Sequence, residues 1–360
     1  MTWAEAGSFA RRERWHLAAL LLAVAVVAGH RSAAGPAGDP WEQDRRQMAQ
    51  HLEQQTTRWS PEAVRTRLAA SPALAWRVGA LSWLFATAVV LGGLAGWRAL
   101  RRRRAGKSWL RGPWRHIPAV PWGVWDIVKV FAWLIALSQA AAFLAALVLR
   151  LGRLPWPDRY LAATVQTMVT DGLALVLVAV LIVRRYRAPV KTLGLHGPPW
   201  SRQIAAGLHG YLLWLPLFLA AGGLVMLVSR WWALEPTPQP VVVMLLQESR
   251  PRLLMALMGL VAVVGPVAEE IVFRGVVYAA LRRRWGVRWG LAGSAVLFAG
   301  LHADPLAFGP ILVLGLLLGW LYEQTGSLLP SMTVHVAHNS VMLITALTAR
   351  DLLRLLGTGP

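Results

Sequence analysis

Two adjacent carboxylates and an arginine lie within an apolar stretch of this 360-residue chain, in the sequence GPVAEEIVFRG at residues 265–275. A charged side chain at the centre of a membrane helix costs about 2.5–3.5 kcal/mol, so three such groups are expected to face inward and to pair. On a helix Glu270 and Arg274 are four residues apart and share a face, whereas Glu269 is turned away by about 100°. The spacing therefore predicts a Glu270–Arg274 ion pair. It leaves Glu269 as a carboxylate that can serve as a general base, with an ion cluster used only for packing as the alternative.

The next apolar segments add imidazole and carboxamide groups. Phe298 and His302 are four residues apart, as are His335 and Asn339, and His338 lies on nearly the same side of its helix as His335. A single histidine in a membrane helix is as often a helix–helix contact as a catalytic group. Two histidines and an amide in one segment are harder to explain by packing, and they favour a functional role for His335.

A base followed by two imidazole-bearing segments is what peptide hydrolysis by direct attack of water requires. The base deprotonates the water and hydrogen-bond donors stabilise the oxyanion, and both are most effective where bulk water is excluded. The residues around Ser331 and Ser340 do not form a nucleophile elbow. The chain also has no cysteine, which excludes thiol nucleophiles and disulfides. The sequence thus favours hydrolysis without a covalent intermediate.

In this order the motifs resemble those of the CPBP family (CAAX protease and bacteriocin-processing), the intramembrane peptidases that include the type II CAAX prenyl endopeptidases. The matching motifs are EExxxR at Glu269, Glu270 and Arg274, FxxxH at Phe298 and His302, and HxxxN at His335 and Asn339. The resemblance covers about 253–346, extends less clearly from residue 121, and does not reach residues 1–120.

The resemblance implies a glutamic peptidase that needs no cofactor. The roles it implies are water activation by Glu269 with help from His302, oxyanion stabilisation by His335 and Asn339, and support from Glu270, Arg274 and Phe298. His338 lies outside the motif and is expected to be a neighbouring or packing residue. Glu269, His302 and His335 could instead form a zinc site with an open position for water, although the HExxH pairing on one helix is missing.

The elements that must position these groups are membrane helices. The chain is 56% hydrophobic and only 15% charged, with a mean hydropathy of +0.47. Apolar runs of spanning or near-spanning length occur at about 15–29, 78–97, 130–149, 161–183, 203–229, 253–281, 289–302, 306–322 and 327–347. No alternating barrel pattern is present. The sequence predicts an all-α polytopic integral membrane helix bundle with about eight or nine transmembrane helices.

The formal charge of +20 reflects basic residues that gather between these spans, most clearly at 101–104, 184–185 and 282–284. The positive-inside rule then places these segments and the N-terminus in the cytoplasm, for a multi-pass protein of the cell inner or plasma membrane. Nucleic acid is not an expected partner, because no aromatic-basic binding module is visible. The expected partners are the lipid bilayer and a membrane-associated protein or peptide substrate, lipidated or not.

The chain is predicted to have two parts. Residues 1–120 would form an N-terminal membrane module with two hydrophobic segments, an external polar loop at 30–77 and a basic cytoplasmic linker. Residues 121–360 would form the intramembrane peptidase core. The first apolar run is expected to be an uncleaved anchor, with a signal peptide as the alternative. The competing function is a transporter or membrane scaffold that uses buried carboxylates and histidines, but no inverted repeat supports it.

Overall fold

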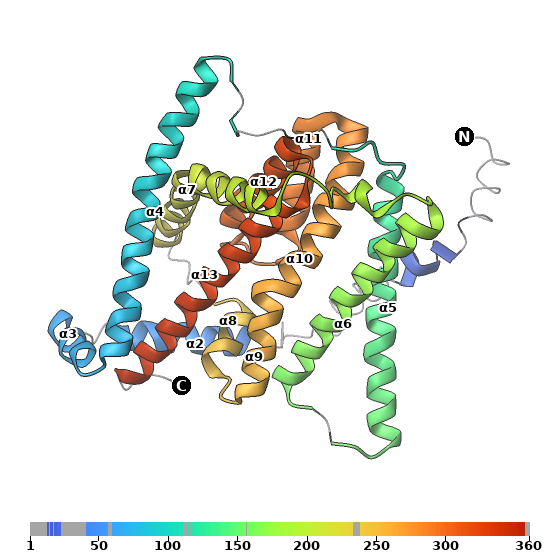
Figure 1. Cartoon of the computed structure of the whole chain (residues 1–360). Coiled ribbons are helices and arrows are strands. Elements are labelled where there is room, and N and C mark those ends of the chain that lie inside the picture. Colours follow the sequence, from blue (N-terminus) through green and yellow to red (C-terminus); the bar gives the residue numbers. More distant parts are fainter. Residues whose placement is uncertain are drawn as a thin grey trace.

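A computed structural model describes residues 13, 15–16, 18–22, 41–56, 60–107, 109–110, 114, 117–155, 157–232 and 238–356, and its regular elements in these ranges are all helices (Figure 1). The longer ones are α2 (Glu42–Thr56), α3 (Pro61–Ala69), α4 (Pro72–Arg104), α5 (Val124–Leu151), α6 (Arg159–Ala179), α7 (Trp200–Trp231), α8 (Pro240–Gln247), α9 (Pro251–Gly259), α10 (Gly265–Glu270), α11 (Ala279–Gly300), α12 (Phe308–Thr325) and α13 (Leu328–Leu355). Three π-helical segments, η1 (Val180–Arg185), η3 (Leu260–Val264) and η4 (Ile271–Tyr278), and the 3₁₀ turn η2 (Val190–Leu193) complete the chain order. The predicted all-α fold is confirmed.

Within the described ranges, six helical stretches are long and apolar enough to cross a membrane. They are Pro72–Arg104, Val124–Leu151, Arg159–Arg185, Trp200–Trp231, Pro251–Gly300 and Phe308–Thr325. The stretch Pro251–Gly300 contains two helices that meet at Gly286, whose φ of 78° and ψ of 178° are not helical. The runs expected at 253–281 and 289–302 therefore lie on opposite sides of this kink. The hydrophobic run at 15–29 lies largely outside the described residues. The chain is therefore a polytopic membrane protein.

Proline-initiated helices follow two serines, as their sequence suggests. Ser60 precedes Pro61 at the start of α3, and its hydroxyl accepts a hydrogen bond from the amide of Ala63. Ser71 precedes Pro72 at the start of α4. A serine at the N-cap followed by proline in the first turn is a preferred way to begin a helix. The polar segment between residues 41 and 70 thus consists mainly of two short helices.

The helices form a bundle in which α4 lies on one side, α5 and α6 lie on the other, and α10 to α13 lie between them (Figure 1). Helix α7 packs against α4, α12 and α13, and α10 packs against α6 and α13. The largest core cluster is built around aromatic and leucine side chains of the central helices, including Phe298, Leu317 and Tyr322. The elements that carry the polar motifs therefore meet at the centre of the bundle.

Two glycines allow these central helices to approach closely. A β-carbon on Gly207 of α7 would lie 2.6 Å from the carbonyl oxygen of Pro330 on α13. A β-carbon on Gly315 of α12 would lie 3.1 Å from the β-carbon of Ala295 on α11. Such contacts leave no room for a larger side chain, so they fix the positions of α12 and α13 against their neighbours.

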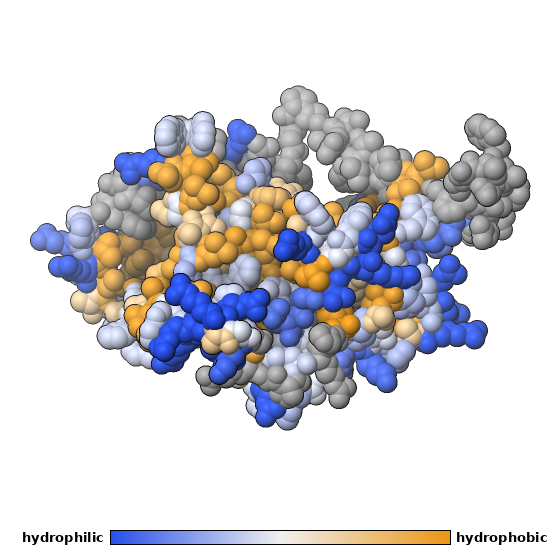
Figure 2. Space-filling model, turned by 90° about the horizontal axis from the view of Figure 1, so that it is seen from above, coloured by the Kyte–Doolittle hydropathy of each residue, from blue (hydrophilic) through white to orange (hydrophobic). Residues whose placement is uncertain are grey.

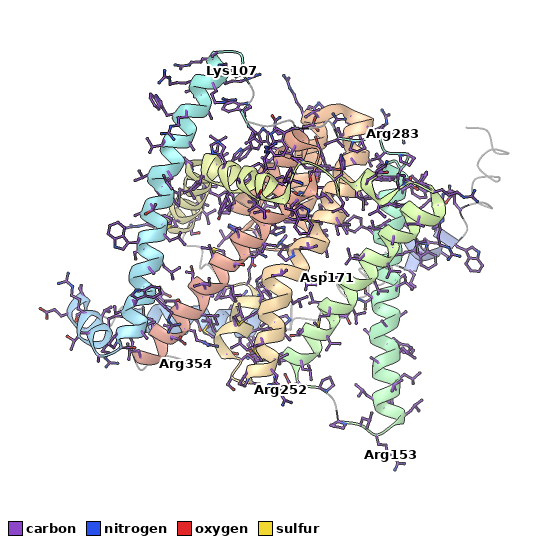
Figure 3. All side chains as sticks on the ribbon, viewed as in Figure 1. Lys107, Arg153, Asp171, Arg252, Arg283 and Arg354 are labelled. Carbon is purple, nitrogen blue, oxygen red and sulfur yellow. The ribbon has the colours of Figure 1, made fainter. Side chains whose placement is uncertain are left out.

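Charged side chains lie toward the two ends of the bundle, as expected for a protein that crosses a bilayer. Figure 3 places Lys107 and Arg283 toward one end and Arg153, Arg252 and Arg354 toward the other. The wide apolar belt between them includes many exposed leucine, valine and phenylalanine side chains. Such a belt matches the hydrocarbon layer, where apolar side chains face lipid at no cost.

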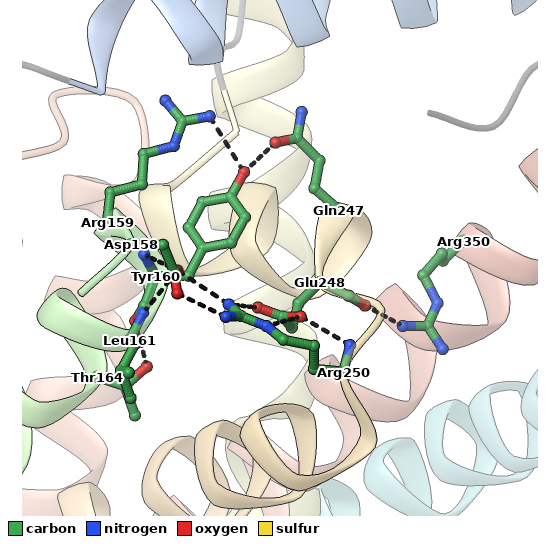
Figure 4. Close-up of polar contacts among 9 residues, drawn as sticks. All are labelled: Asp158, Arg159, Tyr160, Leu161, Thr164, Gln247, Glu248, Arg250 and Arg350. Carbon is green, nitrogen blue, oxygen red and sulfur yellow. Dashed lines mark hydrogen bonds and ion pairs between the residues drawn. The ribbon is translucent and has the colours of Figure 1, made fainter. Parts of the chain in front are cut away.

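An ion-pair network joins the start of α6 to the turn before α9 (Figure 4). Asp158 caps α6 by accepting hydrogen bonds from the amides of Tyr160 and Leu161. Arg250 donates to both carboxylate oxygens of Asp158 and to both of Glu248. The hydrogen bonds from Arg250 lower the pKa of Asp158 and also that of Glu248. The network thus holds the end of the bundle opposite Lys107.

Candidate active site

The two glutamates of the EExxxR motif lie on α10, between the π-helical segments η3 and η4. A π turn bonds residues five apart, and such turns occur frequently at functional sites. Carbonyl groups of both segments accept hydrogen bonds from side chains of other elements. Asn339 donates to the carbonyl of Val261 at 2.9 Å, and the indole of Trp122 donates to that of Val276 at 3.3 Å. The wide turns therefore anchor the glutamate-bearing helix to its neighbours.

Glu270 and Arg274 form the predicted ion pair, and both side chains are inaccessible to solvent. The guanidinium donates to Oε1 of Glu270 at 2.8 Å and to the carbonyl oxygen of Gly315 at 3.2 Å. Its central carbon also lies 4.6 Å from the centre of the Phe298 ring, within the range of a cation–π contact. Removing either member of such a buried ion pair leaves the other charge unpaired and strongly destabilises the folded protein.

His335 lies between the two glutamates. Its Nδ1 is 2.9 Å from Oε1 of Glu270, and its Nε2 is 3.7 Å from Oε2 of Glu269. The ring of Phe298 meets the imidazole edge-on, with 5.6 Å between the ring centres. The imidazole is almost completely buried, whereas the side chain of Glu269 is 36% exposed. Glu269 is thus the carboxylate of this cluster that water can reach.

His302 lies at the end of α11, where its ring contacts Phe298 with 5.0 Å between the centres. Its Nδ1 is 2.9 Å from the carbonyl oxygen of Phe298, and its side chain is exposed. Phe298 therefore contacts both histidines of the motif. The structure brings His302 to the site through this phenylalanine, and the hydrogen bond described for its ring is not to Glu269.

The third histidine, His338, contacts helix α7. Its Nδ1 lies 2.8 Å from the hydroxyl of Tyr211 on α7, and its ring packs on Phe218 of the same helix. His338 therefore links α13 to α7.

Asp171 belongs to none of the three motifs, yet it lies next to the helix that carries the two glutamates. It lies on α6, in the middle of the bundle where α6 and α10 face each other (Figure 3). Its Oδ2 is shielded from solvent and has no hydrogen-bond partner among the described residues. A β-carbon on Gly265, one helical turn before Glu269, would lie 3.7 Å from that oxygen. An acidic residue within the apolar run 161–183 was the available signal, because buried membrane acids are usually functional.

The three candidate zinc ligands are Glu269, His302 and His335. No group of three or more histidine, aspartate or glutamate side chains in the described part of the chain is placed to hold a metal ion. Glu269 and His335 are neighbours, and the Nδ1 of His302 lies 2.9 Å from a backbone carbonyl, which leaves its Nε2 free. In the described part of the chain the three candidate ligands therefore do not form a preassembled metal-binding group.

The comparison with protein families places this site in context. Residues 251–341 match the family model described as Rce1-like, type II CAAX prenyl endopeptidase Rce1-like. Comparisons with curated proteins and with solved structures gave no match. The matched segment runs from the start of α9 into α13 and contains every residue of the three motifs. Residues 251–341 are therefore similar to the Rce1-like type II CAAX prenyl endopeptidases, in agreement with the resemblance of the three motifs to the CPBP family.

Proposed function

We propose that this protein is an intramembrane endopeptidase of the glutamic type, which cuts a membrane-tethered protein or peptide with water activated by Glu269. The Rce1-like domain and the apolar helices support a membrane protease in general. The observation that carries the finer proposal is the position of His335 between an accessible Glu269 and a buried Glu270. This arrangement provides a base and a donor at one point in an otherwise apolar interior.

In the proposed reaction, the Glu269 carboxylate removes a proton from water as the water oxygen attacks the peptide carbonyl carbon. The carbonyl oxygen becomes an oxyanion, which needs donors 2.7–3.1 Å away in typical sites. When the carbon–nitrogen bond breaks, the proton held by Glu269 passes to the leaving amine. Glu269 is then a carboxylate again, and no covalent intermediate forms.

His335 is the proposed principal oxyanion donor, and Glu270 determines how it can act. Glu270, paired with Arg274, accepts the hydrogen of Nδ1, so Nε2 can donate only when the ring carries a second proton. Because Glu270 already offsets the charge of Arg274, the carboxylate of Glu269, 3.7 Å from Nε2, is the group whose charge can balance that of the protonated ring. Glu270 therefore supports catalysis through the imidazole rather than by contact with substrate.

Asn339 and His302 complete the proposed machinery. The amide nitrogen of Asn339 has two hydrogens, and the bond to Val261 uses one of them. The other is available for the oxyanion. His302 is assigned to hold the attacking water, because it is exposed and contacts the phenylalanine that also packs on His335.

The proposed substrate bond lies near the cytoplasmic face of the inner or plasma membrane. Glu269 precedes Arg282 by about three helical turns, and basic residues at this end follow the positive-inside rule. The N-terminus would then be cytoplasmic. A peptide tethered to the bilayer, by a lipid or by its own apolar segment, would present its scissile bond at this depth.

The test is Glu269→Gln in the full-length protein, assayed on a fluorogenic peptide and in parallel for thermal stability. The amide keeps the size of the side chain but cannot take the proton, so turnover should fall about 10²- to 10⁴-fold at unchanged melting temperature. Near-wild-type turnover would show that Glu269 is not the base. A strong chelator should leave wild-type activity intact, and loss with recovery on adding zinc would favour a metal mechanism.

A further inference from the structure

A cavity of about 430 Å³ lies between the last turns of α4 and the first turns of α7, outside the Rce1-like domain. Its lining residues are Arg98, Ala99, Arg102, Trp109, Leu110, Arg202, Ala205, Ala206 and His209. The proposed peptidase mechanism uses none of them. The cavity is thus a separate feature, outside the segment that matches the family model.

The packing of α4 on α7 explains why a hollow forms there. The two helices pack together and touch at Gly92, where a β-carbon would lie 2.7 Å from the carbonyl oxygen of Leu212. Further toward the end that bears Lys107, the facing positions hold the small side chains of Ala99 and Ala206. Small residues between two helices that carry long arginines leave a space walled by guanidinium groups.

The charge of this cavity is of one sign. Arg98 and Arg102 enter it from α4, and Arg202 enters it from α7 together with His209, while none of the described lining residues is acidic. Several arginine side chains around one small space create a positive potential that attracts anions. Guanidinium groups bind phosphate through paired hydrogen bonds, which makes phosphate the best matching anion.

The surroundings of the cavity indicate that the phosphate belongs to a lipid. Both helices are candidate membrane spans, and the cavity lies at the ends where their apolar stretches stop. The exposed side chains Leu94 and Leu208 lie on the same two helices next to it. Figure 2, which looks onto this end, shows hydrophilic side chains beside apolar ones. A ligand with an anionic head and apolar tails matches both kinds of surface.

We propose that this cavity binds the headgroup of an anionic phospholipid, with the phosphate held by Arg98, Arg102 and Arg202 and the acyl chains lying along α4 and α7. Trp109, beside the cavity, is suited to the headgroup region, where indole rings are enriched. Bound lipid would join α4 to α7 and so stabilise the attachment of the N-terminal part of the chain. The site does not depend on the proposed catalytic mechanism.

The experiment follows the melting temperature of the full-length protein in a neutral detergent, with native mass spectrometry to count bound lipids. The probes are short-chain phosphatidylglycerol, short-chain phosphatidylcholine and inorganic phosphate. The cavity variant is Arg98→Gln with Arg202→Gln. The matched control is Arg103→Gln with Arg104→Gln, which removes the same number of positive charges at the end of α4 nearest the cavity, although neither residue lines the cavity.

Phosphatidylglycerol should raise the melting temperature of the wild type and of the control. The cavity variant should need about tenfold more lipid for half of the effect, because lost charge-assisted hydrogen bonds weaken binding. Phosphatidylcholine and phosphate should have little effect. An equal loss in the control would overturn the proposal by showing a general surface charge effect, and an equal response to phosphate alone would overturn the lipid assignment.

A second variant covers the case in which the double substitution does not fold. Ala205→Phe fills the cavity and keeps every charge, and Ala205 is exposed, so the fold tolerates the larger ring. This variant should lose the stabilisation by phosphatidylglycerol and the lipid retained in native mass spectra. An unchanged response would show that the lipid binds elsewhere.

Discussion

Glu270 and His335 are 65 residues apart in the chain and share a buried contact, with Oε1 of the carboxylate 2.9 Å from Nδ1 of the ring. The same oxygen accepts a hydrogen bond from Arg274. One carboxylate therefore neutralises a buried guanidinium and orients an imidazole. The proposed base, Glu269, lies near the other ring nitrogen. Of the two glutamates in the motif, the first is thus placed for the proposed chemistry and the second for support of the imidazole.

Glu270→Gln should damage stability more than Glu269→Gln does. The substitution leaves the buried Arg274 without its charge partner, and breaking a buried pair in this way costs about 3–5 kcal/mol. We expect a clearly lower melting temperature in detergent. Glu269→Gln is the matched control, because its side chain is partly exposed. Equal melting temperatures for the two variants would contradict the supporting role of Glu270.

His335→Ala and Asn339→Ala should each lower kcat far more than they change KM. Groups that stabilise an oxyanion act in the transition state, and removing one such donor costs about 10²- to 10³-fold in turnover. Steady-state kinetics on a fluorogenic peptide measure both constants. His338→Gln is the control, since its ring faces Tyr211 on α7, and it should retain turnover. A rise in KM alone for Asn339→Ala would place that residue in substrate binding.

Gly207→Ala should destabilise the protein by about 1–3 kcal/mol through overpacking. The added β-carbon would lie 2.6 Å from the backbone oxygen of Pro330, which cannot move away as a side chain could. Because α13 carries His335, activity should fall together with the melting temperature. The control is Gly222→Ala on the same helix, where the β-carbon meets nothing within 4 Å. It should match or exceed the wild type, since alanine favours a helix.

Arg250→Gln should lower stability at neutral pH and remove part of its acid dependence. Hydrogen bonds from Arg250 lower the pKa of Asp158 and of Glu248 in the folded protein. Their contribution to stability is thus complete above the unfolded pKa values and is lost as the pH falls through the folded values. The difference in melting temperature between wild type and variant should shrink from pH 7 toward pH 3. A constant difference would show that these carboxylates do not depend on Arg250.

A variant that starts near residue 113 should keep turnover on a generic peptide, since none of the motif residues precedes residue 121. Its melting temperature should fall, because α4 packs on α7 and α13 and its removal exposes those faces. Circular dichroism and a peptidase assay in the same detergent provide the measurement. A well-folded but inactive product would mean that residues 1–120 belong to the active site.

Local spacing predicted much of the site. The four-residue interval gave the ion pair of Glu270 with Arg274 and the contact of Phe298 with His302, because both depend only on helix geometry. The hydrogen bond between His335 and Glu270 depends on how α13 packs against α10, and periodicity does not specify that packing. The role of Asp171 as a neighbour of the site was missed for the same reason, since α6 is distant in sequence.

Helix boundaries were less predictable where the backbone departs from regular α geometry. The apolar runs at 253–281 and 289–302 are separated at Gly286, whose φ of 78° and ψ of 178° interrupt the helix and are readily adopted by glycine. The π turns at 260–264 and 271–278 shift the register of the helix, and the sequence contains no local signal that marks where this happens. What distinguishes both π turns in the structure is a tertiary contact: a backbone carbonyl in each turn accepts a hydrogen bond from a side chain outside that turn.

Because π turns lie before and after α10, the exact number of residues in this segment determines where the two glutamates point. A π turn is equivalent to an α-helix with one residue inserted. Loss of one residue from η3, such as the exposed Val263, would restore regular α geometry and turn Glu269 by about 100° relative to α9. Glu270 would be moved away from His335 by the same rotation. This segment can therefore accept many apolar substitutions, but it cannot change length without separating the glutamates from their imidazole.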